Sequence, residues 1–199
     1  MTATGARLPY QTAARNLLRE TIIDAVDELV RSRGWSATTM SDVAAAAGVS
    51  RQTLYNEFGA RQSLVEAYVT REIEALIAQV TDAVRANADD AHRALRIAFD
   101  LFLQLASDEP VVQVIVNDAE GGELHQLLTG LGRAVASERI AHLIREVWPQ
   151  VGPADARLLA ESLARLAISH ALLPSEEPAV TARGVGRMLG PFVDELLAD

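Results

Sequence analysis

Cysteine is absent from the 199-residue chain, which excludes disulfides, thiolate metal sites and a cysteine nucleophile. No apolar run reaches the roughly 18 residues of a membrane-spanning helix. The first ten residues also lack the apolar core of a signal peptide. Aromatic residues make up only 5% of the chain, whereas apolar residues, mainly alanine and leucine, make up 49%. This composition is typical of a mostly helical protein, and we expect it to be cytoplasmic.

Charge is distributed unevenly along the chain. The net charge is −9, from 18 arginines, no lysine and 27 acidic residues, which at first sight argues against nucleic-acid binding. Residues 1–60 nevertheless hold six arginines and six acidic residues, so the excess of acid lies in residues 61–199. A neutral segment with a basic arm, followed by an acidic body, fits a DNA-reading domain attached to a body that stays away from phosphates.

The stretch Thr38–Phe58 predicts two short helices joined by a tight turn. Thr39 and Asp42 have the spacing of a capping box, with Asp in place of the usual Glu or Gln. Gly48 is expected to end the first helix, because glycine readily adopts the left-handed conformation of many helix ends. Ser50 is placed to cap the second helix. The pattern indicates a helix-turn-helix, and the alternative is an ordinary helical hairpin with a polar outer face.

The second helix of this pair is expected to present polar side chains outward. Leu54 and Phe58 lie four residues apart and should pack onto Val43 and Ala44 of the first helix. The candidates for contacts to base edges in a major groove are Arg51, Gln52 and Thr53. The other candidate DNA contacts, mainly to phosphates, are Thr39, Ser50, Tyr55, Asn56 and Arg61, with Arg7 and Arg15 reaching phosphates from a flexible arm. Tyr55 is alternatively part of the packing.

Five short motifs between about residues 15 and 68 resemble the TetR (tetracycline-repressor) family of bacterial transcription factors: Gly34-Trp35, Ala37-Thr38-Thr39, Asp42-Val43-Ala44, Ala47-Gly48-Val49-Ser50 and Thr53-Leu54-Tyr55-x-x-Phe58. The resemblance implies an all-helical homodimer with a three-helix DNA-binding domain and a larger ligand-binding body. It also implies repression of transcription that a small molecule relieves.

Two positions depart from the pattern of that family. Glu57 stands where His or another neutral or basic residue is common, and it is expected either to repel phosphate or to fix Arg51 or Arg61. Arg61 stands where lysine is common and should still bind phosphate.

The whole chain is expected to be all-α with about nine helices. We expect a DNA-binding domain over residues 1–60 and a ligand-binding and dimerisation domain over residues 61–199. Apolar spacing and breaks at glycine, proline and polar clusters predict helices over about Thr12–Arg33, Arg61–Arg85, a segment ending near Ala106, Leu124–Trp148, Pro153–Leu173 and Ala179–Leu197. The apolar segment Val111–Val116 is expected to be a short buried helix, followed by a loop over Asn117–Glu123.

The last two helices carry broad apolar faces, which favours a twofold four-helix interface between two subunits. The alternative is that both helices belong to the core of one subunit. The candidate interface residues are Ala160, Leu163, Ala164, Ala167, Ala171, Val185, Met188, Leu189 and Phe192.

The effector pocket implied by the resemblance is expected among the helices that follow residue 61. Its candidate lining residues are Phe99, Phe102, Val116, Asn117, His142 and His170. Their apolar majority favours an apolar or aromatic ligand, and no cluster of cations points to a phosphorylated one.

An enzyme is the weaker alternative. The four histidines lack a tight metal-binding spacing, and the sequence has no G-x-S-x-G, P-loop or dinucleotide motif. No cofactor, metal or catalytic residue is therefore expected, and the polar cluster Asn117, Asp118, Glu120, Glu123 and His125 is interpreted as a solvated loop. A further alternative is a helical adaptor that binds protein, or an activator without a small-molecule switch. Salt-sensitive binding to duplex DNA distinguishes the regulator from an enzyme or an adaptor.

Overall fold

The computed structural model describes residues 10–109, 112 and 122–198. Within these ranges the chain is helical and has no strand, which confirms the predicted all-α class. Its elements are α1 (Tyr10–Arg33), α2 (Met40–Ala46), α3 (Arg51–Phe58), α4 (Arg61–Arg85), α5 (Ala91–Asp108), α7 (Glu123–Leu127), the π-helical turn η1 (Leu128–Gly132), α8 (Arg133–Val147), α9 (Pro153–Leu172) and α10 (Pro178–Leu197). In the ranges described, no helix has both the length and the apolar composition of a membrane span.

The chain divides into two compact units, Met1–Tyr68 and Val69–Asp199. Because the continuous helix α4 contributes to both units, the domain boundary expected at residue 60 stays a prediction.

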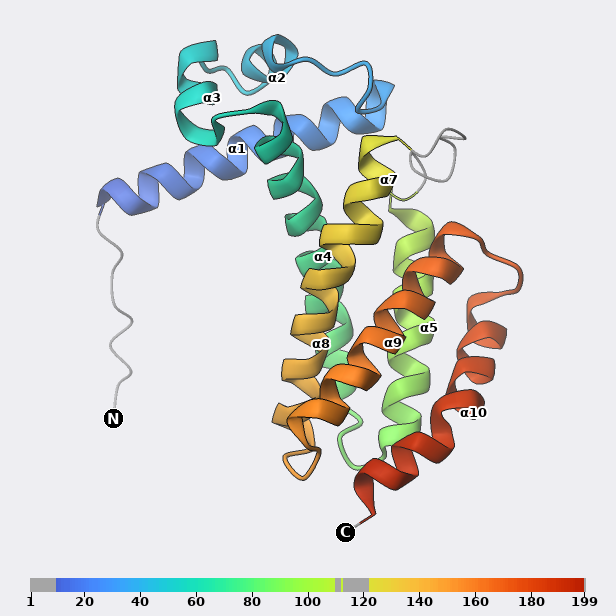
Figure 1. Ribbon diagram of the computed structural model, residues 1–199. Coiled ribbons are helices and arrows are strands. Elements are labelled where there is room, and N and C mark those ends of the chain that lie inside the picture. The colour runs from blue at the N-terminus through green and yellow to red at the C-terminus, as the bar shows by residue number, and fades with distance from the viewer. Residues whose placement is uncertain (1–9, 110–111, 113–121, 199) are drawn as a thin grey trace. The chain divides into compact units, whose positions relative to one another are not determined.

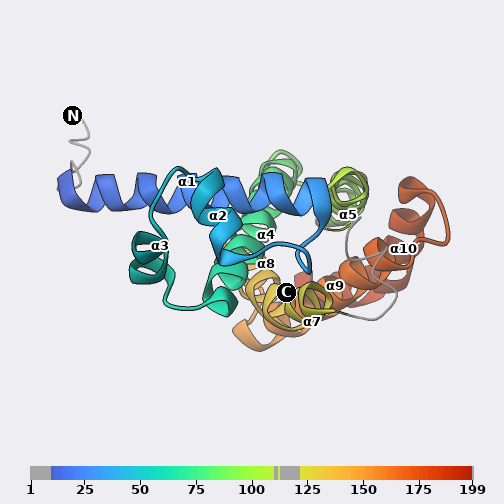
Figure 2. The same ribbon diagram turned by 90° about the horizontal axis from the view of Figure 1, so that it is seen from above.

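In the first unit, α2 and α3 lie along the same side of α1 (Figures 1 and 2). The core that these helices form with the start of α4 includes fully buried side chains, namely Ile22, Val26, Val30, Val43, Leu54, Leu64 and Val65. Tyr68 is also buried, and its hydroxyl donates a hydrogen bond of 3.0 Å to Oδ1 of Asp27 on α1. The predicted packing of α3 on α2 is therefore confirmed, and Trp35 is buried beside it.

The second unit is a helical bundle in which α8 packs against α9 and α10 packs against α5 (Figure 1). One cluster of buried residues joins α8, α9 and α10 through Ile144, Ala160 and Val193. A second cluster joins α5 and α10 through Phe99, Leu103 and Val185.

The helix expected over Leu124–Trp148 runs from Glu123 to Val147, but it contains a π-helical turn that was not predicted. Gly132 ends this turn and is buried. A Cβ atom added at Gly132 would overlap with Cδ1 of Ile73 on α4, so a larger residue here would force the end of that side chain to move.

Several predicted boundaries differ slightly from the structure. α1 begins at Tyr10 instead of Thr12, α5 ends at Asp108 instead of near Ala106, and α10 begins at Pro178. Because Pro lacks a backbone N–H, it is well suited to the first turn of α10. The segment Val111–Val116, apart from the buried helical residue Val112, and the loop expected from Asn117 lie outside the described residues.

Candidate DNA-binding surface and internal cavity

The outer face of α3 consists of polar side chains. Arg51, Gln52, Tyr55 and Asn56 are exposed, and Thr53 is half-buried. Nε2 of Gln52 donates a hydrogen bond of 2.7 Å to Oδ1 of Asn56, one helical turn later. This bond holds the two exposed amide groups next to each other, and each amide can still form further hydrogen bonds with an external partner.

The turn between α2 and α3 sets the angle at which α3 is presented. Gly48 has a φ of 67°, a left-handed conformation that favours glycine. The N–H of Val49 donates to the carbonyl of Ala44 at 2.9 Å, which closes the end of α2. Ser50 then caps α3, because its Oγ accepts a bond of 3.0 Å from the N–H of Thr53. The predicted helix-turn-helix is confirmed.

A complete capping box begins α2. Oγ1 of Thr39 accepts from the N–H of Asp42 at 3.2 Å, and the N–H of Thr39 donates to Oδ2 of Asp42 at 2.9 Å. The hydroxyl of Thr39 also bonds to this carboxylate, and Arg33 lies 3.1 Å from it. The hydrogen bonds from Thr39, and to a lesser extent Arg33, lower the pKa of Asp42. Thr39 therefore stabilises α2 through this box, and its contact to phosphate stays a prediction.

Glu57 joins α3 to α1. Nε of Arg15 donates to both carboxylate oxygens of Glu57 at 3.0 Å, and Nη1 of Arg19 donates to Oε1 at 2.8 Å. Burial acts to raise the pKa of Glu57, but hydrogen bonds from Arg19 and Arg15 and their positive charges outweigh it and lower that pKa. The guanidinium of Arg19 also lies 4.4 Å from the ring centre of Phe58.

This arrangement corrects two expectations. Glu57 binds Arg15 and Arg19, whereas Arg51 or Arg61 had been expected as its partner. Arg15 itself lies within α1 and is held by Glu57, so it does not belong to a flexible arm. Arg7 lies outside the described residues.

Arg61 contributes to the packing of the first unit. Its guanidinium lies 3.9 Å from the ring centre of Trp35, and its Nη2 donates to the carbonyl of Trp35 at 2.9 Å. These contacts fix the start of α4 to the connection between α1 and α2. The structure thus assigns Arg61 a packing function that was not predicted, and its contact to phosphate stays a prediction.

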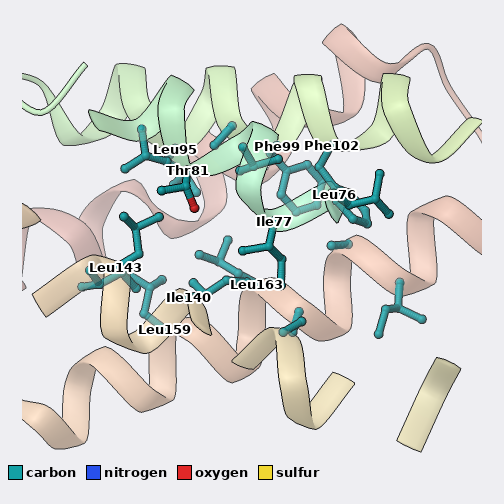
Figure 3. Close-up of a pocket in the computed structure, with 18 of the residues that line it drawn as sticks. Leu76, Ile77, Thr81, Leu95, Phe99, Phe102, Ile140, Leu143, Leu159 and Leu163 are labelled. Carbon is teal, nitrogen blue, oxygen red and sulfur yellow. The ribbon is translucent and has the colours of Figure 1, made fainter. Parts of the chain in front are cut away.

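The second unit contains an apolar cavity of about 160 Å³. Leu76, Ile77, Leu95 and Phe99 of α4 and α5 face Ile140, Leu143, Leu159 and Leu163 of α8 and α9 across it (Figure 3). Residues of α10 complete the wall. Among the described residues that line it, the side chains carry two polar atoms, the hydroxyl of Thr81 and the indole nitrogen of Trp148.

Two of the six predicted lining residues, Phe99 and Phe102, line this cavity. The prediction was wrong for His142, whose side chain is 82% exposed beside Glu146 on the outer face of α8. It was also wrong for His170, which meets the ring of Phe99 edge-on at 6.3 Å but is not part of the wall. Val116 and Asn117 lie outside the described residues.

Asp118 and Glu120 of the polar cluster also lie outside those residues. Across the ranges that the structure does describe, no three metal-ligating side chains come together.

Comparison with known proteins agrees with this geometry. The family model for bacterial regulatory proteins of the tetR family matches residues 22–68, and the model for the C-terminal domain of the bacterial tetracycline repressor matches residues 90–191. The chain is 35% identical over 191 residues to the HTH-type transcriptional regulator AlkX of Mycobacterium tuberculosis, covering 94% of this chain and 90% of that protein. This chain belongs to the TetR family.

A crystal structure similar to this chain is that of the TetR-family repressor AlkX from Dietzia sp. strain DQ12-45-1b, a repressor implicated in biodegradation of n-alkanes. It is 36% identical, with a TM-score of 0.77, over 90% of this chain and 96% of that one. The HTH-type transcriptional activator FasR of Mycolicibacterium smegmatis is 34% identical over 98 residues, which are 49% of this chain and 42% of that protein. As a TetR-family member, the chain is a helix-turn-helix transcriptional regulator that binds operator DNA as a dimer.

The structure changes the set of residues that can form the dimer of this TetR-family protein. Ala160, Ala164 and Val185 are buried within their own subunit, so assigning them to the interface was wrong. Ala164, Ala167 and Ala171 line the cavity, so these small residues of α9 leave space for it. Of the other candidates Met188 is 58% exposed, whereas Leu163, Leu189 and Phe192 are half-buried against the core clusters.

Sequence reasoning missed most of the cavity wall. The positions along α4 from Ile73 to Val84, which line the cavity, had been predicted only as part of the helix Arg61–Arg85. Thr81 was the available signal, because it interrupts the apolar side of that helix with a hydroxyl.

Proposed function

We propose that this TetR-family protein is a repressor which an unbranched hydrocarbon chain releases from a palindromic operator. The observation that carries the proposal is the shape and chemistry of the cavity in the second unit. The similar repressor from Dietzia, implicated in biodegradation of n-alkanes, supports the same class of ligand.

The cavity is narrow for its length. Its wall includes residues of α4 from Ile73 to Val84, and eleven residues of helix correspond to about 17 Å. Its volume of about 160 Å³ is close to the roughly 150 Å³ of a cavity that holds one benzene. A rigid, fused ring system cannot bend to follow such a cavity, whereas a flexible chain can extend along its length.

The chemistry of the wall favours a ligand without charge. None of the residues lining the cavity, within the described ranges, is an arginine, a histidine or an acid. A charged group buried there would have no partner, which is strongly unfavourable. An apolar chain instead gains about 0.8 kcal/mol for each methylene that leaves water.

On the DNA side, we propose that the two α3 helices of a dimer enter successive major grooves, about 34 Å apart or a multiple of that distance. Arg51 and Gln52 are proposed to contact bases, with Thr53 beside them. Thr39, Ser50, Tyr55, Asn56 and Arg61 are proposed to lie along the phosphates.

For the dimer we propose the outward faces of α9 and α10. Leu158, Leu173, Val180 and Met188 are exposed large apolar side chains on or directly after these helices. Gly184 is exposed between Val180 and Met188, and it leaves space for a partner helix to approach closely.

A second candidate function is activation, because the similar protein FasR is an activator. An operator that overlaps the promoter would favour repression. An operator upstream of it, together with increased transcription when the protein is added, would favour activation.

The proposal is tested by selecting an operator from random duplex DNA and then titrating n-alkanes into the protein–operator complex. Gln52→Ala is expected to lose about 1–3 kcal/mol of discrimination between operator and random DNA. Ala167→Leu fills part of the cavity and should abolish release by the alkane while operator binding is retained. Ala154→Leu places the same side chain at an exposed site on α9 and should respond like the wild type. Release that is equal in both leucine variants would contradict the proposed ligand site.

A further inference from the structure

Thr81 places a hydroxyl in the described part of the cavity wall, which is otherwise almost entirely apolar. Two threonines elsewhere on the helices give their hydroxyl proton to the carbonyl four residues earlier: Thr21 donates to Leu17 at 2.9 Å and Thr129 donates to His125 at 2.8 Å. Among the described residues, the hydroxyl of Thr81 has no such partner. Figure 3 shows its oxygen turned toward the space that the labelled side chains surround.

The other polar atom of the wall is already bonded. Nε1 of Trp148 donates to the carbonyl of Ala88 at 3.1 Å. The hydroxyl of Thr81 is therefore the side-chain group of the described wall that is left to bond a ligand. A water molecule is poorly held there, because it needs two to four polar partners and the side chains offer one.

We infer that the effector carries one uncharged oxygen, as in an alcohol, an aldehyde or a ketone, and that this oxygen forms a hydrogen bond with Thr81. The inference rests on the proposed hydrocarbon-chain function and makes its ligand more specific. A ligand oxygen would satisfy the hydroxyl, which is otherwise unfavourable in apolar surroundings. A carboxylate would not suit the site, because the described wall supplies no cation.

The position of Thr81 also determines which way round the hydrocarbon chain of the ligand lies in the cavity. Thr81 lies three residues before Val84, or about 4.5 Å along α4, and eight residues after Ile73, or about 12 Å. The oxygenated end of the ligand therefore lies near Val84 and Trp148. The hydrocarbon tail extends toward Ile73 and Gly132, which are also part of the wall.

The test compares Thr81→Val, which removes the hydroxyl and keeps the shape, with Thr81→Ser, which keeps the hydroxyl and removes a methyl group. Binding of 1-decanol and of decane to the full-length protein is measured by calorimetry and by tryptophan fluorescence, because Trp148, one of the two tryptophans, borders the cavity. For each ligand the dissociation constant of the variant is divided by that of the wild type, so the different solubilities of the two ligands cancel.

Thr81→Val is expected to raise the dissociation constant of 1-decanol by about tenfold and that of decane by less than about twofold. Thr81→Ser should bind 1-decanol within about threefold of the wild type. If Thr81→Val raises both dissociation constants by the same factor, the inferred hydrogen bond is wrong, but the proposed hydrocarbon site is not contradicted. If decanoate binds more tightly than 1-decanol at alkaline pH, the inference that the oxygen of the effector is uncharged is wrong. If neither decane nor 1-decanol binds the wild-type protein, the proposed function itself fails.

Discussion

The contact between Gly132 and Ile73 leads to a prediction in which one substitution has opposite effects in two backgrounds. Gly132 has helical backbone angles, with φ −58° and ψ −44°. Alanine at this position would therefore gain up to about 1 kcal/mol of helix propensity. Its Cβ would, however, overlap with Cδ1 of Ile73.

The structure sets the size of the two effects. Forcing an extra methyl group into a packed site costs about 1–3 kcal/mol, so Gly132→Ala should destabilise the protein by about 0–2 kcal/mol after the helix gain. Ile73→Val removes only Cδ1, the atom in conflict, at a cost of about 0.5–1.5 kcal/mol. In that background Gly132→Ala should stabilise the protein by about 0.5–1 kcal/mol. The coupling free energy between the two sites is then about 1–3 kcal/mol.

Urea unfolding of the wild type, both single variants and the double variant measures this coupling from the transition midpoints and slopes. The same variants should differ in ligand binding, because Ile73 and Gly132 both line the cavity. Gly132→Ala pushes Ile73 toward the cavity and should therefore weaken the binding of long hydrocarbon ligands more than that of short ones. A Gly132→Ala effect that is the same in both backgrounds, within error, would refute the close contact.

Two further predictions concern the DNA-binding unit. Glu57→Gln should lower the free energy of unfolding at neutral pH by about 1 kcal/mol, a modest value because Arg15 is 64% exposed. Since the folded pKa of Glu57 is lowered, the difference from wild type in urea midpoint should be full above the ordinary pKa of glutamate. It should shrink as the pH falls through the lower folded pKa, and a difference that grows toward acid would contradict the ion pair. Gly48→Ala should cost about 1 kcal/mol because of its left-handed backbone, whereas Gly130→Ala, which meets equally open space, should be neutral or stabilising.

Much of the first unit was predictable because its determinants are close in sequence. The capping box joins Thr39 to Asp42, the cap of α3 joins Ser50 to Thr53, and the left-handed turn needs only Gly48. Each of these interactions spans at most three residues. Their spacing is therefore visible in the sequence itself.

The partners of Glu57 and Arg61 were not predictable in the same way. Arg15 and Glu57 are 42 residues apart, and Trp35 and Arg61 are 26 apart. An exposed-looking charge has many possible partners in a sequence. Only the crossing of α1 with α3, and of the α1–α2 connection with α4, decides which one it meets.

In the second unit, too, some features were predictable from the sequence and others depended on tertiary packing. Amphipathic spacing was enough to predict that α9 and α10 have apolar faces, because burial of a helix follows its own periodicity. Whether Ala160 packs in a core, Ala167 borders a cavity or Met188 meets solvent depends on which helix lies opposite. Alanine and leucine serve all three environments equally well, since apolar burial has no direction. The sequence therefore determined the helices and the DNA-binding motif, whereas tertiary packing alone decided where the bundle leaves a space and which hydroxyl faces it.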